Sequence, residues 1–143
     1  MKFLKFNSKK EVNVNVSKYL IDWDDKQCSN PEWVVKQFLK PFWKNHVVCS
    51  EFRLPGSLNR LDYINLSLKP KLAIEVSPES THARYNEFMH GSRAGYRKRI
   101  RVDLEKEEWC IQNGIRMITL EDEDFKSENL NKVYFKEKFD LDL

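Results

Sequence analysis

The sequence has no long apolar run. No segment approaches the roughly 18 consecutive apolar residues that a membrane-spanning helix requires. The N-terminal Met-Lys-Phe-Leu-Lys-Phe segment lacks the apolar core and the cleavage site of a signal peptide. We therefore expect a cytoplasmic protein that has no membrane partner.

Cysteine is scarce, and its spacing argues against two kinds of site. Cys28, Cys49 and Cys110 are odd in number and far apart, and no Cys-x-x-Cys pair occurs. The sequence therefore indicates neither a disulfide framework nor a zinc site. We interpret the three residues as reduced thiols. Internal repeats and low-complexity tracts are also missing.

The composition is that of a folded domain. The chain has 143 residues, of which 41% are hydrophobic and 13% aromatic, enough for one domain with its own core. We expect a single domain over 1–143, with an N-terminal strand extension over 1–29, a core over 30–124 and a C-terminal tail over 125–143. The tail is expected to be a short helix or loop plus disorder.

Turn and capping signals predict the order of the elements. Asn30, Pro31 and Glu32 suit the cap, the first position and the positive dipole of a helix start. The expected elements are one or two strands within 12–23, a helix from 30 kinked or ended at Pro41, strands over 46–52, 60–66 and 72–77, a long polar loop over 78–96, a helix over 97–113 stopped by Gly114, and a strand over 115–120. Helix, three strands, helix and strand in this order predict a mixed α/β sandwich with one crossover.

One acid stands in each of two neighbouring apolar segments. Asp62 lies within Arg60-Leu-Asp-Tyr-Ile-Asn-Leu66, and Glu75 lies within Leu72-Ala-Ile-Glu-Val-Ser77. Burying a carboxylate is costly unless it is paired or bound to a metal ion. Two carboxylates at one end of a sheet can hold Mg²⁺ against a phosphodiester. The alternative is that both acids face water, because every second side chain of a two-sided strand is exposed.

Basic residues crowd one short stretch of the chain, although the net charge is only +3. Such a run on a mildly basic domain is typical of proteins that bind phosphate backbones. The candidate DNA-binding residues are Arg84, His90, Arg93, Arg97, Lys98, Arg99 and Arg101. The alternative is a solvated, charge-rich loop.

The predicted helix over 97–113 carries an unusual lysine. At 100° per residue, Lys106 falls between two apolar stripes, so we expect its side chain to point toward the sheet. The alternative is an ion pair with Asp103 on the same helix. The stripes are Ile100, Leu104 and Ile111 on one side and Val102 with Trp109 on the other, while Arg101, Glu105, Glu108 and Gln112 share the opposite, solvated side.

Together these residues resemble the PD-(D/E)XK nucleases, and within them the very-short-patch-repair and phage homing-endonuclease branch. Asp62 matches the first acid of the motif, and Glu75-Val76-Ser77 matches the acid-x-Lys that follows, with serine in place of lysine. The further matches in chain order are Glu32 on the first helix, Glu51 on the first core strand, His82, Asp103, Lys106, Gly114 and the acids from Glu121 to Asp124. The resemblance spans roughly Asn30 to Asp124.

The resemblance implies a restriction-endonuclease-like α-β-β-β-α-β core with extra N-terminal strands, and a Mg²⁺-dependent DNA endonuclease that Mn²⁺ could also support. Asp62, Glu75 and the main-chain carbonyl of Val76 would give Mg²⁺ three oxygen ligands. The candidate catalytic residues are Glu32, Glu51, Asp62, Glu75, Ser77, His82 and Lys106. A phage-encoded enzyme of this kind would work in the host cytoplasm.

Two departures from the family pattern keep other functions open. Pro78 replaces a glycine, and Ser77 replaces the motif lysine, so that Lys106, Lys98 or His82 would have to supply the missing group. The enzyme could nick or cut both strands, or be a structure-specific nuclease such as a junction resolvase. A catalytically inactive nucleic-acid-binding module is the third possibility. A homodimer could form by pairing of an exposed strand edge within 12–23.

Overall fold

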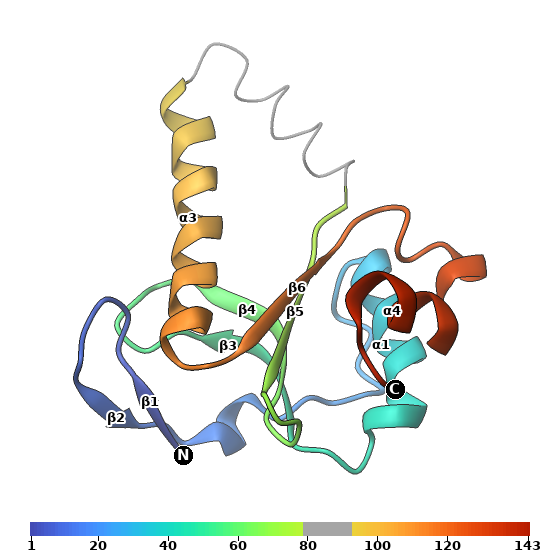
Figure 1. Ribbon diagram of the computed structural model, residues 1–143, viewed down its shortest axis with the longest axis horizontal. Helices are drawn as coiled ribbons and strands as arrows, with labels where there is room; N and C mark the ends of the chain where they lie inside the picture. Colours follow the sequence, from blue (N-terminus) through green and yellow to red (C-terminus); the bar gives the residue numbers. More distant parts are fainter. Residues whose placement is uncertain (79–92) are drawn as a thin grey trace.

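A four-stranded mixed β-sheet forms the centre of the structure (Figure 1). The structure is a computed structural model that describes residues 1–78 and 93–143, without the side chains of 93–96 and 99. The strands lie side by side in the order β3 (Val48–Arg53), β4 (Arg60–Asn65), β5 (Leu72–Val76) and β6 (Arg116–Leu120). The pairs β3–β4 and β4–β5 are antiparallel, whereas β5 and β6 run parallel. Parallel neighbours need a crossover connection, and it contains α3 (Arg93–Gln112).

The element order confirms the mixed α/β class predicted from the sequence. Helix α1 (Asn30–Trp43) precedes β3, β4 and β5, and α3 and β6 follow. The N-terminal cap of α1 is Ser29 rather than Asn30, because the Ser29 hydroxyl accepts the N–H of Glu32 at 3.4 Å. Pro41 lies inside the last turn, and the helix continues beyond it to Trp43.

Helices cover both faces of the sheet. In Figure 1, α1 and α4 (Lys132–Phe139) lie on one side of the strands, and α3 lies on the other. Strand β5 shows why, because Ala73 packs into the core beneath α3 while Leu72 and Ile74 pack into the core beneath α1 and α4. This alternation buries both faces of β5, which accounts for its nearly continuous apolar sequence.

The N-terminal segment differs from the one or two strands predicted within 12–23. A hairpin of β1 (Lys2–Leu4) and β2 (Glu11–Asn13) precedes a 3₁₀ helix over Val16–Tyr19, so the expected strand edge is limited to residues 11–13. The hairpin packs on α3: the Trp109 indole N–H donates to the Leu4 carbonyl at 2.9 Å, and the Phe3 and Trp109 rings are 5.6 Å apart. This arrangement depends on contacts between residues that are more than 100 positions apart in the sequence.

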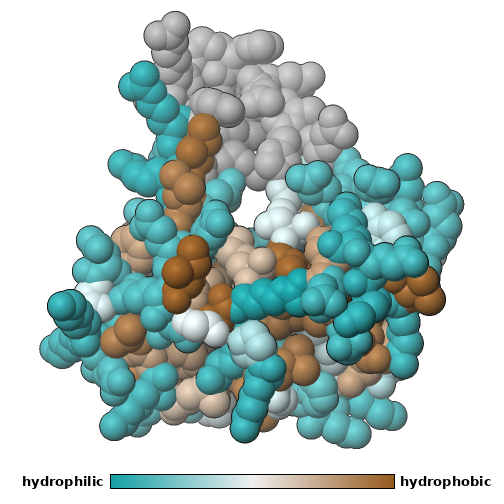
Figure 2. Space-filling view, viewed as in Figure 1, coloured by the Kyte–Doolittle hydropathy of each residue, from teal (hydrophilic) through white to brown (hydrophobic). Residues whose placement is uncertain are grey.

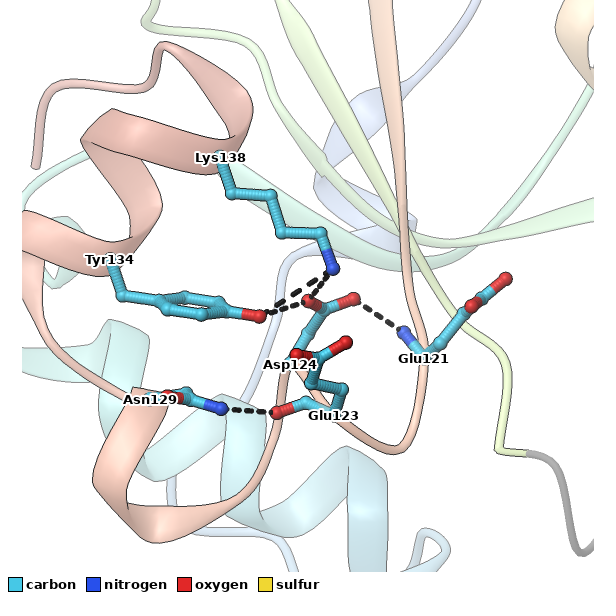
Figure 3. A network of polar contacts seen from close by, with 6 residues as sticks. All are labelled: Glu121, Glu123, Asp124, Asn129, Tyr134 and Lys138. Atoms are coloured by element: carbon cyan, nitrogen blue, oxygen red, sulfur yellow. Dashed lines mark hydrogen bonds and ion pairs between the residues drawn. The ribbon is translucent and has the colours of Figure 1, made fainter.

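The C-terminal segment contains the short helix that was one of the expectations, α4, and it packs into the core, so the expectation of disorder there is wrong. Phe135 of α4 is fully buried in the core beneath α1. Figure 3 shows how the helix is tied to the end of β6, since the buried Asp124 carboxylate accepts the N–H of Glu121 and the hydroxyl of Tyr134, each at 2.8 Å, and contacts the Lys138 ammonium. Burial alone would raise the pKa of Asp124, but these donors hold it below its ordinary value.

Helix α3 has three different faces. Trp109 and Cys110 are buried against the sheet. Glu105 and Gln112, expected in solvent, instead contact the β3–β4 turn and the N-terminal hairpin. One of the two predicted apolar stripes faces solvent, since Ile100, Leu104 and Ile111 are 41%, 50% and 71% exposed. Figure 2 shows apolar side chains along α3. Among the described residues, no helix has the length and apolar character needed to cross a membrane.

Candidate metal and nucleic-acid site

The predicted acids Asp62 and Glu75 meet at one end of the sheet. Strands β4 and β5 pair regularly up to Tyr63 and Ile74, and beyond this point side chains take over the hydrogen bonding. The N–H of Asp62 donates to Glu75 Oε1 at 3.2 Å, and the N–H of Val76 donates to Asp62 Oδ2 at 2.8 Å. The two carboxylates are therefore fixed by backbone groups of the opposite strand.

Glu51 reaches the same place through an unusual backbone conformation. It lies in β3 between two regular pairs, Ser50 with Tyr63 and Phe52 with Leu61, and has a φ of 49°. A residue other than glycine in this left-handed region costs about 1–3 kcal/mol and tends to occur at functional sites. The side-chain alternation changes here, because Cys49 and Phe52 pack into the same core cluster although three positions separate them.

Glu32 joins these acids from the other layer. It lies in the first turn of α1, and the Tyr63 hydroxyl donates to its carbonyl at 3.1 Å, which ties the helix start to β4. One carboxylate oxygen from each of Glu32, Glu51 and Asp62 lies within 4.8 Å of the other two. We call these three residues the acidic cluster. Its carboxylates could hold a metal ion.

The acids repel one another, as their pKa values show. Burial, and next the charge of Asp62, raise the pKa of both Glu32 and Glu51. The same two causes raise the pKa of Glu75 to about 8, against the opposing effect of Lys106. Crowding and partial removal from water both disfavour the charged form of these carboxylates, and both raise their pKa values. A cation bound among them would relieve this repulsion.

Lys106 is directed into the site from α3, as predicted. Its Nζ lies 3.2 Å from Glu75 Oε2, and the two side chains are only 15% and 12% exposed. In the part of the chain that the structure describes, this ion pair forms and the alternative pair with Asp103 does not. The position is therefore set by the contact of α3 with the sheet.

These groups line a pocket between the sheet and α3. It has a volume of about 620 Å³, and Asp62, Glu75 and Lys106 contribute to its wall. The predicted residues Val76 and Ser77 also line it, and Lys98 and Asp103 are on the α3 side. The N–H of Ser77 donates to the Leu120 carbonyl at 2.8 Å, which extends the pairing of β5 with β6 to the pocket. We call this hollow the acid pocket.

The remaining predicted residues have different positions. Arg97, Lys98 and Arg101 are exposed on α3. Arg93 and Arg99 belong to the same helix, but their side chains lie outside the description. The predictions for His82, Arg84 and His90 fall outside the described residues.

Sequence reasoning missed the contribution of β6. Thr119 pairs with Glu75 in parallel register, and Thr119 and Met117 line the acid pocket. Neither residue has a pattern of its own that signals a site. Their place follows only from the pairing of β6 beside β5.

Comparisons with models of protein families, with curated proteins and with solved structures found no match. The resemblance to PD-(D/E)XK nucleases therefore stays a prediction based on the residues of this chain.

Proposed function

We propose that this protein is a Mg²⁺-dependent DNA endonuclease that hydrolyses phosphodiester bonds. The observation that supports it best is the meeting of Asp62, Glu75 and Lys106 at one pocket, beside the further acids Glu32 and Glu51. Three strands (β3, β4 and β5) and two helices, one from each side of the sheet, supply these side chains. Four carboxylates and one ammonium group in this arrangement fit a site that binds a divalent cation next to an anionic substrate.

The donors present fit Mg²⁺. They are carboxylate oxygens, which are the ligands that this ion prefers. Asp62 would be the central ligand, because it lies beside Glu75 and also belongs to the acidic cluster with Glu32 and Glu51. Each oxygen of Glu75 accepts one donor, and each keeps a second lone pair that could bind a cation while the Lys106 contact stays in place. Mg²⁺, when bound, would lower the pKa of a coordinated water and neutralise charge on the phosphate.

The other side chains would bind and orient the DNA. Lys98 and Arg101 are exposed cations on the helix that forms one wall of the acid pocket, and they would contact phosphates. Lys106 is held in place before substrate arrives. Its ammonium group would stabilise the negative charge that develops on the phosphate during hydrolysis, as a preorganised donor does.

The position of Lys106 favours an enzyme over a binding module. Ser77 cannot supply the cation of the family motif, but Lys106 puts an ammonium group 3.2 Å from the motif glutamate. Carboxylates close to a phosphate would weaken simple DNA binding by repulsion. They are useful when a metal ion is bound between them and the phosphate.

Incubation with supercoiled plasmid DNA tests the proposal. With Mg²⁺ or Mn²⁺ we expect nicked or linear product, and with EDTA none. Asp62→Asn should abolish cleavage, whereas Glu108→Gln, which changes an exposed acid of α3 outside the acid pocket, should cut like the parent. A parent protein that leaves plasmid, linear and four-way-junction DNA intact with either metal would refute the enzyme, and cleavage confined to the junction would favour the resolvase.

A further inference from the structure

A second hollow lies next to the acid pocket, on the side of the N-terminal hairpin. It has a volume of about 970 Å³. Three segments that are far apart in the sequence form it: residues from 6 to 19, the β3–β4 turn over 53–59, and α3. Lys98 and Val102 line both hollows, so the two adjoin each other. We call the second hollow the hairpin groove.

Specific contacts hold the three walls together. The N–H of Phe6 donates to the Pro55 carbonyl at 2.7 Å, which joins the hairpin to the turn. Asn59 donates to Glu105 Oε2 at 2.6 Å, which joins the turn to α3. Gly56 has a φ of 81°, and a Cβ there would lie 3.0 Å from the backbone nitrogen of Phe6. The close approach of the turn and hairpin therefore requires glycine, and the groove is preformed.

The groove combines an apolar interior with a cationic rim. Phe6 and Tyr19 are half-buried within it, and Leu58 at the tip of the turn is 82% exposed. Lys98 and Arg101 are exposed along its α3 side. Apart from Glu105, which Asn59 engages, no acid lines it among the described residues. The adjoining acid pocket, by contrast, is rich in carboxylates.

We propose that the hairpin groove receives an unpaired nucleotide of the DNA strand that is cut, beside the scissile phosphate. The inference rests on the proposed function, because the acid pocket fixes where that phosphate lies. A nucleotide joins an apolar base to an anionic phosphate, which matches an apolar interior beneath Lys98 and Arg101. In a fully paired duplex the base faces are stacked inside the helix and cannot enter such a groove. An unpaired base can, and stacking on aromatic side chains would hold it.

The substrate is therefore DNA with an unpaired or extruded nucleotide next to the cut. Lys98, which lines both hollows, is placed to bind the phosphate that links the nucleotide in the groove to the one at the acid pocket. Neither assignment requires a base-specific hydrogen bond. Discrimination would depend on the pairing of the nucleotide rather than on its sequence.

Binding without cleavage tests this inference separately from the enzyme. We would measure fluorescence anisotropy in EDTA with two labelled duplexes that differ by one unpaired nucleotide. The parent protein should bind the duplex with the unpaired nucleotide at least about fivefold more tightly, the lower end of what one stacked base contributes. Leu58→Asn should reduce this ratio toward one, because it removes an apolar side chain that lines the groove. Leu58 is exposed, so the change should leave the core undisturbed. Leu104→Asn is the control, because Leu104 is an exposed leucine of α3 outside the groove, and it should leave the ratio unchanged.

Photocrosslinking then locates the nucleotide. With 5-iododeoxyuridine at the unpaired position, the crosslinked peptide should contain Phe6, Tyr19 or a residue of the turn over 53–59. The groove assignment would be overturned by equal affinity for the two duplexes or by an affinity ratio that Leu58→Asn leaves unchanged. It would also be overturned if no crosslink formed, or if the crosslink formed at residues outside the groove. A preference that persists in a protein unable to cut DNA would refute the proposed function alone. Efficient cutting without any preference would refute the groove alone.

Discussion

Replacing Lys106 by methionine separates its chemical role from its structural role. Methionine fills a similar space but carries no charge. Lys106 forms a partly buried ion pair with Glu75, and removing one partner of a buried pair usually costs about 3–5 kcal/mol because the other charge is left alone. Glu75 need not remain charged, however. Its pKa is already raised to about 8, and loss of the ammonium group raises it further.

At pH 7 the variant should therefore lose only about 1 kcal/mol of its free energy of unfolding, the scale of one pKa unit. The dependence on pH has a definite sign. A carboxyl group whose folded pKa is raised contributes stability at pH values below its unfolded pKa, and this contribution is lost as the pH rises through the folded pKa. The stability difference between Lys106→Met and the parent should accordingly grow between pH 7 and pH 9. Urea unfolding at several pH values measures it.

The catalytic loss should be much larger. Removing one preorganised electrostatic donor typically lowers kcat by about 10²–10³. The rate of plasmid nicking with protein in excess gives this factor per folded molecule. Lys98→Met is the matched control, because Lys98 is an exposed lysine of the same helix and pocket. It should weaken DNA binding and change the cutting rate far less.

A second variant tests whether the lysine of the family motif has moved to α3. Ser77→Lys in the Lys106→Met background would return the ammonium group to the motif position, and we expect partial recovery of cutting. If Lys106→Met cuts as fast as the parent but loses more than about 3 kcal/mol of stability, Lys106 is structural. The assignment of its catalytic role would then be wrong.

Three other changes have equally definite outcomes. Replacing Arg97, Lys98 and Arg101 together by alanine should flatten the slope of log affinity against log salt by about 2.7 for three lost phosphate contacts, as measured by DNA binding across a salt series. Asp124→Asn should lower the free energy of unfolding at pH 7 by about 1–2 kcal/mol, because the carboxylate accepts several donors. The pKa of Asp124 is lowered in the folded state, so this stability difference should shrink as the pH falls below about 4. The rise in Tm caused by Mg²⁺ should increase from pH 6 to pH 8.5, because Glu75, whose pKa is raised to about 8, retains a proton that must leave before it binds a cation.

Two of these predictions have a matched control variant. Lys44→Ala, an exposed cation at the end of α1, should leave the salt slope unchanged. Glu123→Gln, next to Asp124 but exposed, should leave stability at pH 7 nearly unchanged. A pH-independent effect of Mg²⁺ on Tm would contradict proton release from the acids. An unaltered salt slope in the triple variant would mean that these α3 cations do not contact DNA.

Local patterns were sufficient to predict the central elements and the direction of one key side chain. Apolar runs bounded by turn residues indicate β3, β4 and β5, and the helical angle of Lys106 places it toward the sheet. The acids Asp62 and Glu75 become neighbours once these strands pair. Each of these features depends on residues that are close in sequence or on adjacent strands, which is why the sequence reveals them.

Other features depend on contacts that no local pattern records. The hairpin of β1 and β2 docks on Trp109 of α3, and Gln112, which was expected in solvent, donates to the Lys5 carbonyl. The left-handed backbone of Glu51 is imposed by its surroundings, because a glutamate does not favour it. Phe135 lies among lysines that suggest a disordered tail, but Asp124 and Tyr134 tie its helix to the core.

Diffraction from crystals grown with Mn²⁺ tests the central claim most directly, because the anomalous signal of the metal reveals its position without regard to activity. The account predicts one strong peak or more at the acid pocket, with an Asp62 oxygen as a ligand and at least one oxygen from Glu32, Glu51 or Glu75 beside it. Crystals of Asp62→Asn grown in the same way should lose the peak. A parent protein that shows no peak at these carboxylates, or one that Asp62 does not coordinate, would contradict the proposed metal site and the nuclease built on it.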